Sequence, residues 1–410
     1  MTIDAGKTGL PVDVEHVGEN RMLLNMGPQH PSTHGVLRLL IELDGEVVRA
    51  CEADMGYLHR GVEKLIETHD YRGGITLTDR MDYTAGPSNN MGYLMAIEKL
   101  MGVTDDIPLR ARYLRTAVAE LSRLASHHIW IGTHALDIGA MSAFLYSLRE
   151  REKILHLFEQ ACGARMTTSF MRVGGTGPHD IGDQWLDNVA DFLDGYTLHE
   201  IDELVTENEI FMERTRDVGV VTKEQCFSFG LTGPLLRGSG VAWDLRKTQP
   251  YAAYDLVDFE VPVFSEGDVY ARYLVRLNEM YQSCRIIQQC VDAIRDLPLD
   301  SASNIDRPEI VPPDISRVPV DMEAMINHFK LVMHGVQPEP GEAYFGIENP
   351  KGELGYYFVS DGSGMPYRCH VRSPSFVNLS IIEEISVGTL IADVVAIIGS
   401  VDIVLGEVDR

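Results

Sequence analysis

Alternating apolar and polar residues predict strands in the first part of the chain. The segment VLRLLIELDGEVVRACEAD, residues 36–54, alternates on both sides of LDGE, which is typical of a tight turn. We expect an antiparallel hairpin there, with residues 20–55 mainly in strands. The next segment, GYLHRGVEKLIET (56–68), predicts the start of a helix.

A helical period replaces this alternation from about residue 88 to 165. NNMGYLMAIEKLMG (89–102) opens with Asn89 and Asn90, which we expect to cap a helix, and it ends in glycine. Apolar positions then recur at three- and four-residue steps in two further segments. They are Leu121, Leu124, Ala125, His128 and Ile131 in the first, and Leu145, Leu148, Leu155 and Phe158 in the second. Further helices are predicted over 181–215 and 268–296.

The last third of the chain changes character again. Turn signals at NPKGE (349–353) and SDGSG (360–364) separate β-rich runs, which predicts an antiparallel meander that returns to helix near 380–398. The fold class is therefore α+β: a central helical bundle with an N-terminal β-hairpin and sheet and a C-terminal meander. We divide the chain into an N-terminal α/β region (1–75), the bundle (76–320) and a C-terminal β-rich region (321–410).

Composition narrows the possible partners. The formal net charge of −26 argues against binding nucleic acid or anionic lipid through the protein's own field. Such acidity serves solubility, or it indicates that basic partner subunits cover part of the surface. The first residues lack the features of a signal or transit peptide. The most apolar stretch, 387–406, contains Asp393 and Asp402, so we expect no membrane-spanning segment.

Six scattered cysteines argue against a metal centre in this chain. No C-x-x-C pair occurs among them, and zinc and iron–sulfur sites depend on such spacing. We expect reduced thiols and no cofactor bound by this chain. Any iron–sulfur cluster that serves it must belong to a partner.

Two histidines in MGPQHPSTHG (26–35) are the first candidates for chemistry. His30 and His34 have the i, i+4 spacing of a helical metal site, but Pro31 between them disfavours a helix. They are metal ligands, proton or hydrogen-bond donors, or ordinary loop residues.

Two further segments carry candidate polar groups. Tyr83, in DRMDYTAGPSNN (79–90), is either a packed turn tyrosine or a phenol that points into a cleft. Asp137, late in an apolar helix, must meet solvent at Gly139 or be paired or protonated; histidine would be a natural partner.

Another segment concentrates positive charge without matching a known phosphate motif. LRGSGVAWDLRKTQPY (236–251) fits neither G-x-x-x-x-G-K-[ST] nor G-x-G-x-x-G. We interpret it as an ordered loop that docks on another chain or on this chain's own bundle.

Taken together, these segments resemble one family. MGPQHPSTHGVLRL, GYLHRGVEKL, DRMDY, THALDIGA, LRGSGVAWDLRKTQPY, SDGSGMPYRC and ADVVAIIGSVDIVLGEVDR resemble the 49-kDa-type subunit of respiratory complex I, the D-type subunit of the bacterial enzyme. The resemblance runs from about residue 20 to Arg410. It implies a peripheral-arm subunit of a proton-pumping NADH:quinone oxidoreductase (a translocase), inactive alone, on the cytoplasmic side of the bacterial plasma membrane.

That family is similar to the large subunit of nickel–iron hydrogenases, which hold their metals with two C-x-x-C pairs. The counterparts here would be RMDYTA (80–85), with Asp82 and Ala85 at the cysteine positions, and DIVLGEV (402–408), with Val404 and Glu407. A nickel–iron centre requires soft thiolates, and these positions supply none. A hydrogenase-type enzyme is therefore disfavoured, and a non-catalytic assembly scaffold is the other alternative.

The resemblance implies that the vacated centre forms the quinone site, shared with a small subunit that carries the terminal (4Fe–4S) cluster. It implies that His34 and Tyr83 hydrogen-bond the quinone headgroup and that Asp137 pairs with His34. Gly35 and Val36 would line the site, and His30, Arg60 and Asp82 would support it. The 30-kDa-type subunit and a membrane-arm subunit at the quinone entrance are the further implied partners.

The physical chemistry agrees with this assignment. Two-electron reduction makes the quinone oxygens basic, and an imidazolium and a phenol can each donate one proton. The chain departs from the family's pattern at Thr167, a position where relatives usually carry histidine.

Overall fold

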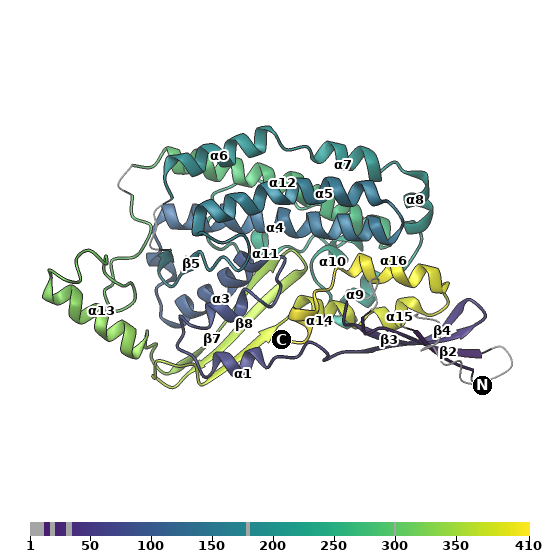
Figure 1. Cartoon of the computed structure of the whole chain (residues 1–410), viewed down its shortest axis with the longest axis horizontal. Helices are drawn as coiled ribbons and strands as arrows, with labels where there is room; N and C mark the ends of the chain where they lie inside the picture. The colour runs from purple at the N-terminus through teal and green to yellow at the C-terminus, as the bar shows by residue number, and fades with distance from the viewer. Residues whose placement is uncertain (1–11, 17–20, 30–34, 178–180, 299–300) are drawn as a thin grey trace.

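The computed structural model describes residues 12–16, 21–29, 35–177, 181–298 and 301–410. A layer of long helices lies over a three-stranded sheet, and a second sheet extends at the end of the molecule that carries the N-terminus (Figure 1). The fold is α+β, as predicted. Among the described residues, no helix combines the length and the hydropathy that a bilayer crossing requires.

The N-terminal sheet confirms the predicted hairpin. Its strands, in antiparallel order, are β1 (Val12–His16), β2 (Arg21–Met26), β3 (Arg38–Asp44) and β4 (Val47–Asp54). Asp44 pairs with Val47 across the LDGE turn. Alternate residues Leu39, Ile41 and Leu43 of β3 are buried, as the period-two pattern requires.

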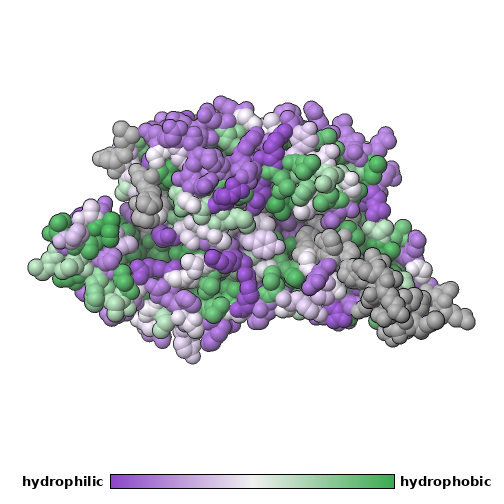
Figure 2. All heavy atoms as spheres, viewed as in Figure 1, coloured by the Kyte–Doolittle hydropathy of each residue, from purple (hydrophilic) through white to green (hydrophobic). Residues whose placement is uncertain are grey.

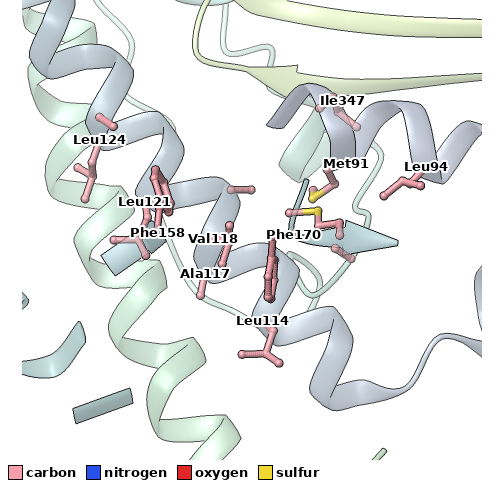
Figure 3. Packing of buried hydrophobic residues seen from close by; sticks show 14 of the residues in the cluster. Met91, Leu94, Leu114, Ala117, Val118, Leu121, Leu124, Phe158, Phe170 and Ile347 are labelled. Atoms are coloured by element: carbon pink, nitrogen blue, oxygen red, sulfur yellow. The ribbon is translucent and has the colours of Figure 1, made fainter. Parts of the chain in front are cut away.

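Four long helices form the bundle: α3 (Gly86–Leu100), α4 (Leu109–Asp137), α5 (Met141–Cys162) and α12 (Val269–Arg295). All five residues predicted to share a face of α4 are buried. Figure 3 shows α4 side chains such as Leu121 packing toward Phe158, and Phe170 lying near Met91. The helices α6 (Asp183–Asp194), α7 (Leu198–Val205) and α8 (Glu209–Thr215) cover the bundle.

Two details of the helical prediction are wrong. Asn89 and Asn90 do not cap α3; they lie inside it, fully buried, because the helix begins earlier, at Gly86. Their amides instead bond to the preceding turn, where Asn89 donates to the carbonyl oxygens of Thr78 and Asp82. Leu145, predicted to face the core from α5, is 57% exposed because it lies on the outer side of that helix.

The C-terminal meander is confirmed. Strands β7 (Gly341–Asn349), β8 (Gly352–Ser360) and β9 (Arg368–Arg372) pair antiparallel. Helix α3 packs against this sheet at Gly92, where an added Cβ would meet Ile347 and Tyr356 at 3.1 Å. A larger residue at this position would force Ile347 or Tyr356 to shift.

The chain then returns to helix through α14 (Pro374–Leu379), α15 (Ile382–Ser386), α16 (Ile391–Val401) and α17 (Leu405–Val408). These last helices share a hydrophobic cluster with β3 and β4, separate from the cluster of the bundle. Backbone bonds join the two ends of the chain: Val48 donates to Thr389 at 2.9 Å, and Ile391 donates to Glu46 at 2.9 Å. The second core therefore combines the first and the last parts of the sequence with a few residues between Val221 and Leu236.

The remaining elements are short or peripheral. They are α1 (Val62–Ile66), α2 (Ile75–Thr78), η3 (Thr104–Asp106), β5 (Met171–Arg172), β6 (Gly175–Thr176), α9 (Lys223–Phe229), α10 (Pro234–Gly238), α11 (Leu245–Thr248) and α13 (Met322–His334).

The loop 236–251 docks on its own bundle. Arg237 and Arg246 are fully buried, and Arg237 bonds Glu279 and Glu348 at 2.6 Å each. Arg246 bonds Asp244 at 2.7 Å. These groups form what we call the arginine network, whose members are Arg123, Arg237, Arg246, Glu120, Asp244, Glu279 and Glu348.

Candidate functional site

The turn between α2 and α3, residues 79–85, presents Tyr83 at the surface. The backbone amide of Thr84 donates to Oδ1 of Asp82 at 3.1 Å, and its hydroxyl donates to the same oxygen at 2.6 Å. Together with the hydrogen bonds from Asn89, these contacts fix the turn on its buried side. Asp82 is completely buried, whereas Tyr83, the next residue, is 43% exposed.

A buried lysine lies beneath this turn. Lys351, in the β7–β8 turn, donates from Nζ to Thr84 Oγ1 at 2.7 Å and to Ser126 Oγ at 2.5 Å. Its Nζ also lies 3.3 Å from Asp82 Oδ2 and 3.8 Å from Asp402 Oδ2. Burial opposes the charge, but Asp402 and Asp82 outweigh it and raise the pKa of Lys351, so the amine is a cation.

Two more carboxyl groups reach this place from the end of the chain. Burial raises the pKa of Asp402 to about 6, although Lys351 and Arg276 oppose the shift. Burial, and then the charge of Asp82, raise the pKa of Glu407 to about 7. We call the group Asp82, Thr84, Ser126, Lys351, Asp402 and Glu407 the Asp82 cluster. Two of its acids titrate close to neutral pH, which is characteristic of functional sites.

Some of these groups also shift the pKa of Tyr83. Burial raises its pKa, with a further contribution from the negative charges of Asp82 and Asp402, while Lys351 and Arg60 lower it. The phenol therefore keeps its proton at neutral pH. Among the described residues its hydroxyl makes no hydrogen bond, and the side chain is partly exposed.

The two segments that sequence analysis paired do meet. Asn349 Nδ2 lies 3.3 Å from Asp82 Oδ2 and 3.5 Å from Glu407 Oε1, and so bridges 80–85 to 402–408. Ala85 and Val404, at the other two positions, are buried. In the part of the chain that the structure describes, no group of three His, Cys, Asp or Glu side chains is arranged to hold a metal.

His30 and His34 lie outside the described residues, so their roles stay predictions. Their flanks form a hairpin: Met26 at the end of β2 pairs with Leu39 of β3. The amide of Gln29 donates to the carbonyl of Gly35 at 2.6 Å, so these two flanking residues lie close together. Gly35 is exposed and Val36 is half-buried against the second core.

Asp137 is the last residue of α4 and is half-buried. Burial raises its pKa to about 6. In the described part of the chain its carboxylate has no recorded hydrogen-bond or ion-pair partner, and its expected partner His34 lies outside that part. Asp137 follows Ser126 by three turns of α4, so both lie on one face of the helix, about 16 Å apart along its axis.

The remaining candidates lie around Tyr83. Arg60 donates from Nη2 to the carbonyl of Arg80 at 2.6 Å, next to the turn. Thr167 is exposed with φ of 50°, a left-handed conformation that is strained for a β-branched residue. Its loop is tied to the same turn, because Ser169 donates to Asp79 Oδ2 at 2.6 Å.

Sequence reasoning gave no site role to Lys351, Ser126 or Asn349. Lys351 appeared within a turn signal, and nothing local indicates that it is buried. A lysine next to Pro350 and Gly352 is usually solvated. The signal that could have found it is charge balance: two segments rich in buried carboxylates require a cation from elsewhere in the chain.

Comparisons with known proteins identify the family of the chain. Residues 137–410 match the family described as the 49 Kd subunit of respiratory-chain NADH dehydrogenase. The chain belongs to this family. It is 51% identical to the D-type subunit of an NADH-quinone oxidoreductase from Geotalea uraniireducens, over 95% of this chain and 98% of that one. It is 49% identical to a D-type subunit of the same oxidoreductase from Koribacter versatilis, over 98% and 99%.

Proposed function

We propose that this chain forms the quinone-reduction site of an NADH-quinone oxidoreductase, together with that complex's small iron–sulfur subunit. Membership in the 49 Kd family makes it a subunit of such an oxidoreductase, not active alone. In the finer proposal, electrons pass to quinone from a (4Fe–4S) cluster in the small subunit, and this chain itself binds no cofactor. The 30-kDa-type and membrane-arm subunits are further partners, at the cytoplasmic face of a bacterial plasma membrane.

The half-exposed phenol of Tyr83 above the buried Asp82 cluster carries the proposal. A quinone that takes two electrons needs two protons, and a donor must still hold its proton at neutral pH. The raised pKa of Tyr83 meets this requirement. Lys351 below offsets the phenolate that donation leaves behind, and Asp402 and Glu407, with pKa values of about 6 and 7, can return a proton.

His34 donates the second proton in this proposal. A hydrogen bond joins Gln29 and Gly35, the residues on either side of its segment. Asp137, with a pKa of about 6, has an affinity for protons close to that of an ordinary histidine. A proton shared between these two groups would move when His34 gives one to quinone. His30 and Arg60 have supporting roles in this proposal, and Arg60 bonds to the Tyr83 turn.

The identities of the residues favour quinone chemistry over a nickel–iron centre. Hydrogenase-type ligation needs thiolates, and the four corresponding positions hold Asp82, Ala85, Val404 and Glu407. Lys351 lies between the two segments, and its cation would repel a metal ion.

The test is Tyr83→Phe, measured as quinone reductase turnover in membranes with the complex intact on a native gel. We expect a loss of at least about 100-fold, the usual contribution of a general acid. NADH oxidation by an artificial acceptor that bypasses quinone stays at the wild-type rate. Tyr146→Phe, at a tyrosine of similar exposure on α5, is the matched control and keeps full turnover. Normal turnover of Tyr83→Phe with several quinones would favour the assembly-scaffold alternative.

A further inference from the structure

Helix α13 projects from the end of the molecule opposite the N-terminal sheet (Figure 1). Its inner face packs on the protein through Ala324 and Leu331, which are 4% and 3% exposed. Its outer face is a continuous apolar stripe at helical spacing. The stripe consists of Met322, Met325, Ile326, Phe329, Val332 and Met333, each between 44% and 72% exposed.

This arrangement is unusual for a surface helix. Such a helix normally turns its apolar side to the core and its charged side to water. In α13 the charged residues Glu323 and Lys330 lie along one flank, and the face opposite the core is apolar. Figure 2 shows hydrophobic side chains gathered at this end of the molecule. Exposed apolar patches of this kind mark interaction sites.

A groove borders α13 at His328, beside the stripe. Its volume is about 870 Å³, and its lining combines apolar residues such as Ile310, Val311 and Ile315 with polar and charged ones that include Arg72 and Arg172. Ile315 is itself 73% exposed. Stripe and groove therefore form one surface, which we call the α13 surface.

We infer that the α13 surface docks an apolar segment of a basic partner subunit within the oxidoreductase complex. The charge of the chain selects this occupant. At −26, a second copy of this chain or an anionic membrane would be repelled, whereas a basic protein is attracted. Three of the six stripe residues are methionines, whose flexible side chains adapt to the shape of a partner. The inference rests on family membership and is independent of the quinone site.

Cysteine accessibility tests whether the surface is covered. Met325→Cys is placed in the stripe, and Ile210→Cys, at a 68% exposed position on α8, is the control. A maleimide polymer is added to the intact complex and to the complex dissociated by chaotrope. We expect labelling at position 325 to be at least tenfold slower in the intact complex, with little change at position 210. Equal rates at position 325 in both samples overturn the inference.

Cross-linking identifies the occupant. A short bifunctional reagent attached to the thiol of the Met325→Cys variant is expected to join this chain to another subunit of the complex, and that subunit has a basic isoelectric point. A product of twice this chain's mass would instead indicate a second copy. A product with photoactivatable lipid would indicate the membrane, and either result overturns the inference.

A charged substitution completes the test. Phe329→Asp is expected to reduce recovery of the cross-linked subunit in the purified complex at least tenfold, because it places a carboxylate in an apolar contact. Tyr83→Phe leaves that recovery unchanged, so failure of the docking inference and failure of the quinone-site proposal are distinguishable. Full recovery of the subunit with Phe329→Asp overturns the docking inference.

Discussion

The β7–β8 hairpin carries one residue of each of two buried charged clusters: Glu348 belongs to the arginine network and Lys351 to the Asp82 cluster. In the arginine network, burial works against ionisation, yet Arg123 and Arg246 hold the pKa of Glu120 below its usual value. Arg237, followed by His127, does the same for Glu279. Glu348 is the exception, because burial, followed by the negative charge of Asp244, raises its pKa.

The Asp82 cluster has the opposite balance. Lys351 lies 3.3 Å from Asp82 and 3.8 Å from Asp402, and Arg276 lies 3.7 Å from Asp402, so burial outweighs these more distant cations at Asp402 and Glu407 and raises their pKa values to about 6 and 7. The contrast indicates that close pairing of cations with carboxylates separates a cluster that stabilises the fold from one that can exchange protons. Only the second cluster lies beneath a half-exposed tyrosine.

The largest effect is expected in the arginine network. Arg237→Met leaves Glu279 and Glu348 buried without their main partner, which costs about 3–5 kcal/mol of unfolding free energy. Urea unfolding of the purified chain measures it. Arg285→Met, which breaks the exposed pair with Asp258, is the control and costs less than about 1 kcal/mol. If both variants lose the same unfolding free energy, the arginine network does not stabilise the fold more than an exposed ion pair does.

Removing the lysine of the other cluster should cost less. In Lys351→Met, Asp402 and Glu407 can take up protons at pH 6, so we expect the free energy of unfolding to fall by about 2 kcal/mol there. The loss is larger at pH 8, where both acids are ionised. Because Lys351 lowers the pKa of Tyr83, the alkaline limb of quinone turnover also moves to higher pH. A pH-independent cost with an unmoved limb would show that the two clusters behave alike.

The pH dependence of stability should isolate Glu407. Its folded pKa, about 7, lies above its ordinary value, so the folded chain holds a proton that the unfolded chain has released. The free energy of unfolding therefore falls as pH rises from the ordinary glutamate pKa of 4.5 to about 7, by at most about 1.4 kcal/mol per pH unit. Glu407→Gln is expected to flatten this slope between pH 6 and 7, above the pKa of Asp402. An unchanged slope in urea titrations would contradict the assignment.

The smallest effect is expected at Ser126. Ser126→Ala removes one hydrogen-bond acceptor of Lys351 but leaves Thr84, Asp82 and Asp402. We therefore expect the free energy of unfolding to fall by about 1 kcal/mol and quinone turnover to stay nearly unchanged. Thermal unfolding and turnover measure the two quantities. A collapse of turnover in this variant would mean that the hydroxyl itself relays protons.

The sequence predicted the elements whose patterns are local. The period-two alternation of β3 and the helical period of α4 each follow from burial of one face, and both are confirmed. The start of α3 was missed because Asn89 and Asn90 are good capping residues in isolation. Tertiary contacts make them buried donors instead, bonded to the Tyr83 turn. Leu145 was misplaced because α5 is also apolar on part of its outer side.

The candidate site was only partly accessible to sequence reasoning. Asp82 and Tyr83 stand together in one motif, so their closeness was foreseeable. Lys351 lies 267 residues from Thr84, and no periodic signal records a contact over such a separation. The roles of His30, His34 and Asp137 follow from the family resemblance and stay predictions.

The joining of the two chain ends has a consequence for synthesis on the ribosome. The apolar faces of β3 and β4 are complete by Asp54, but their partners in α15, α16 and α17 end at Val408. At about 5–20 residues per second, the ribosome needs roughly 20 to 70 s to supply the second half of this core. Until then the nascent sheet lacks its C-terminal partners, and Val221, Leu235 and Leu236 from the middle of the chain are among the first residues of this core to reach it.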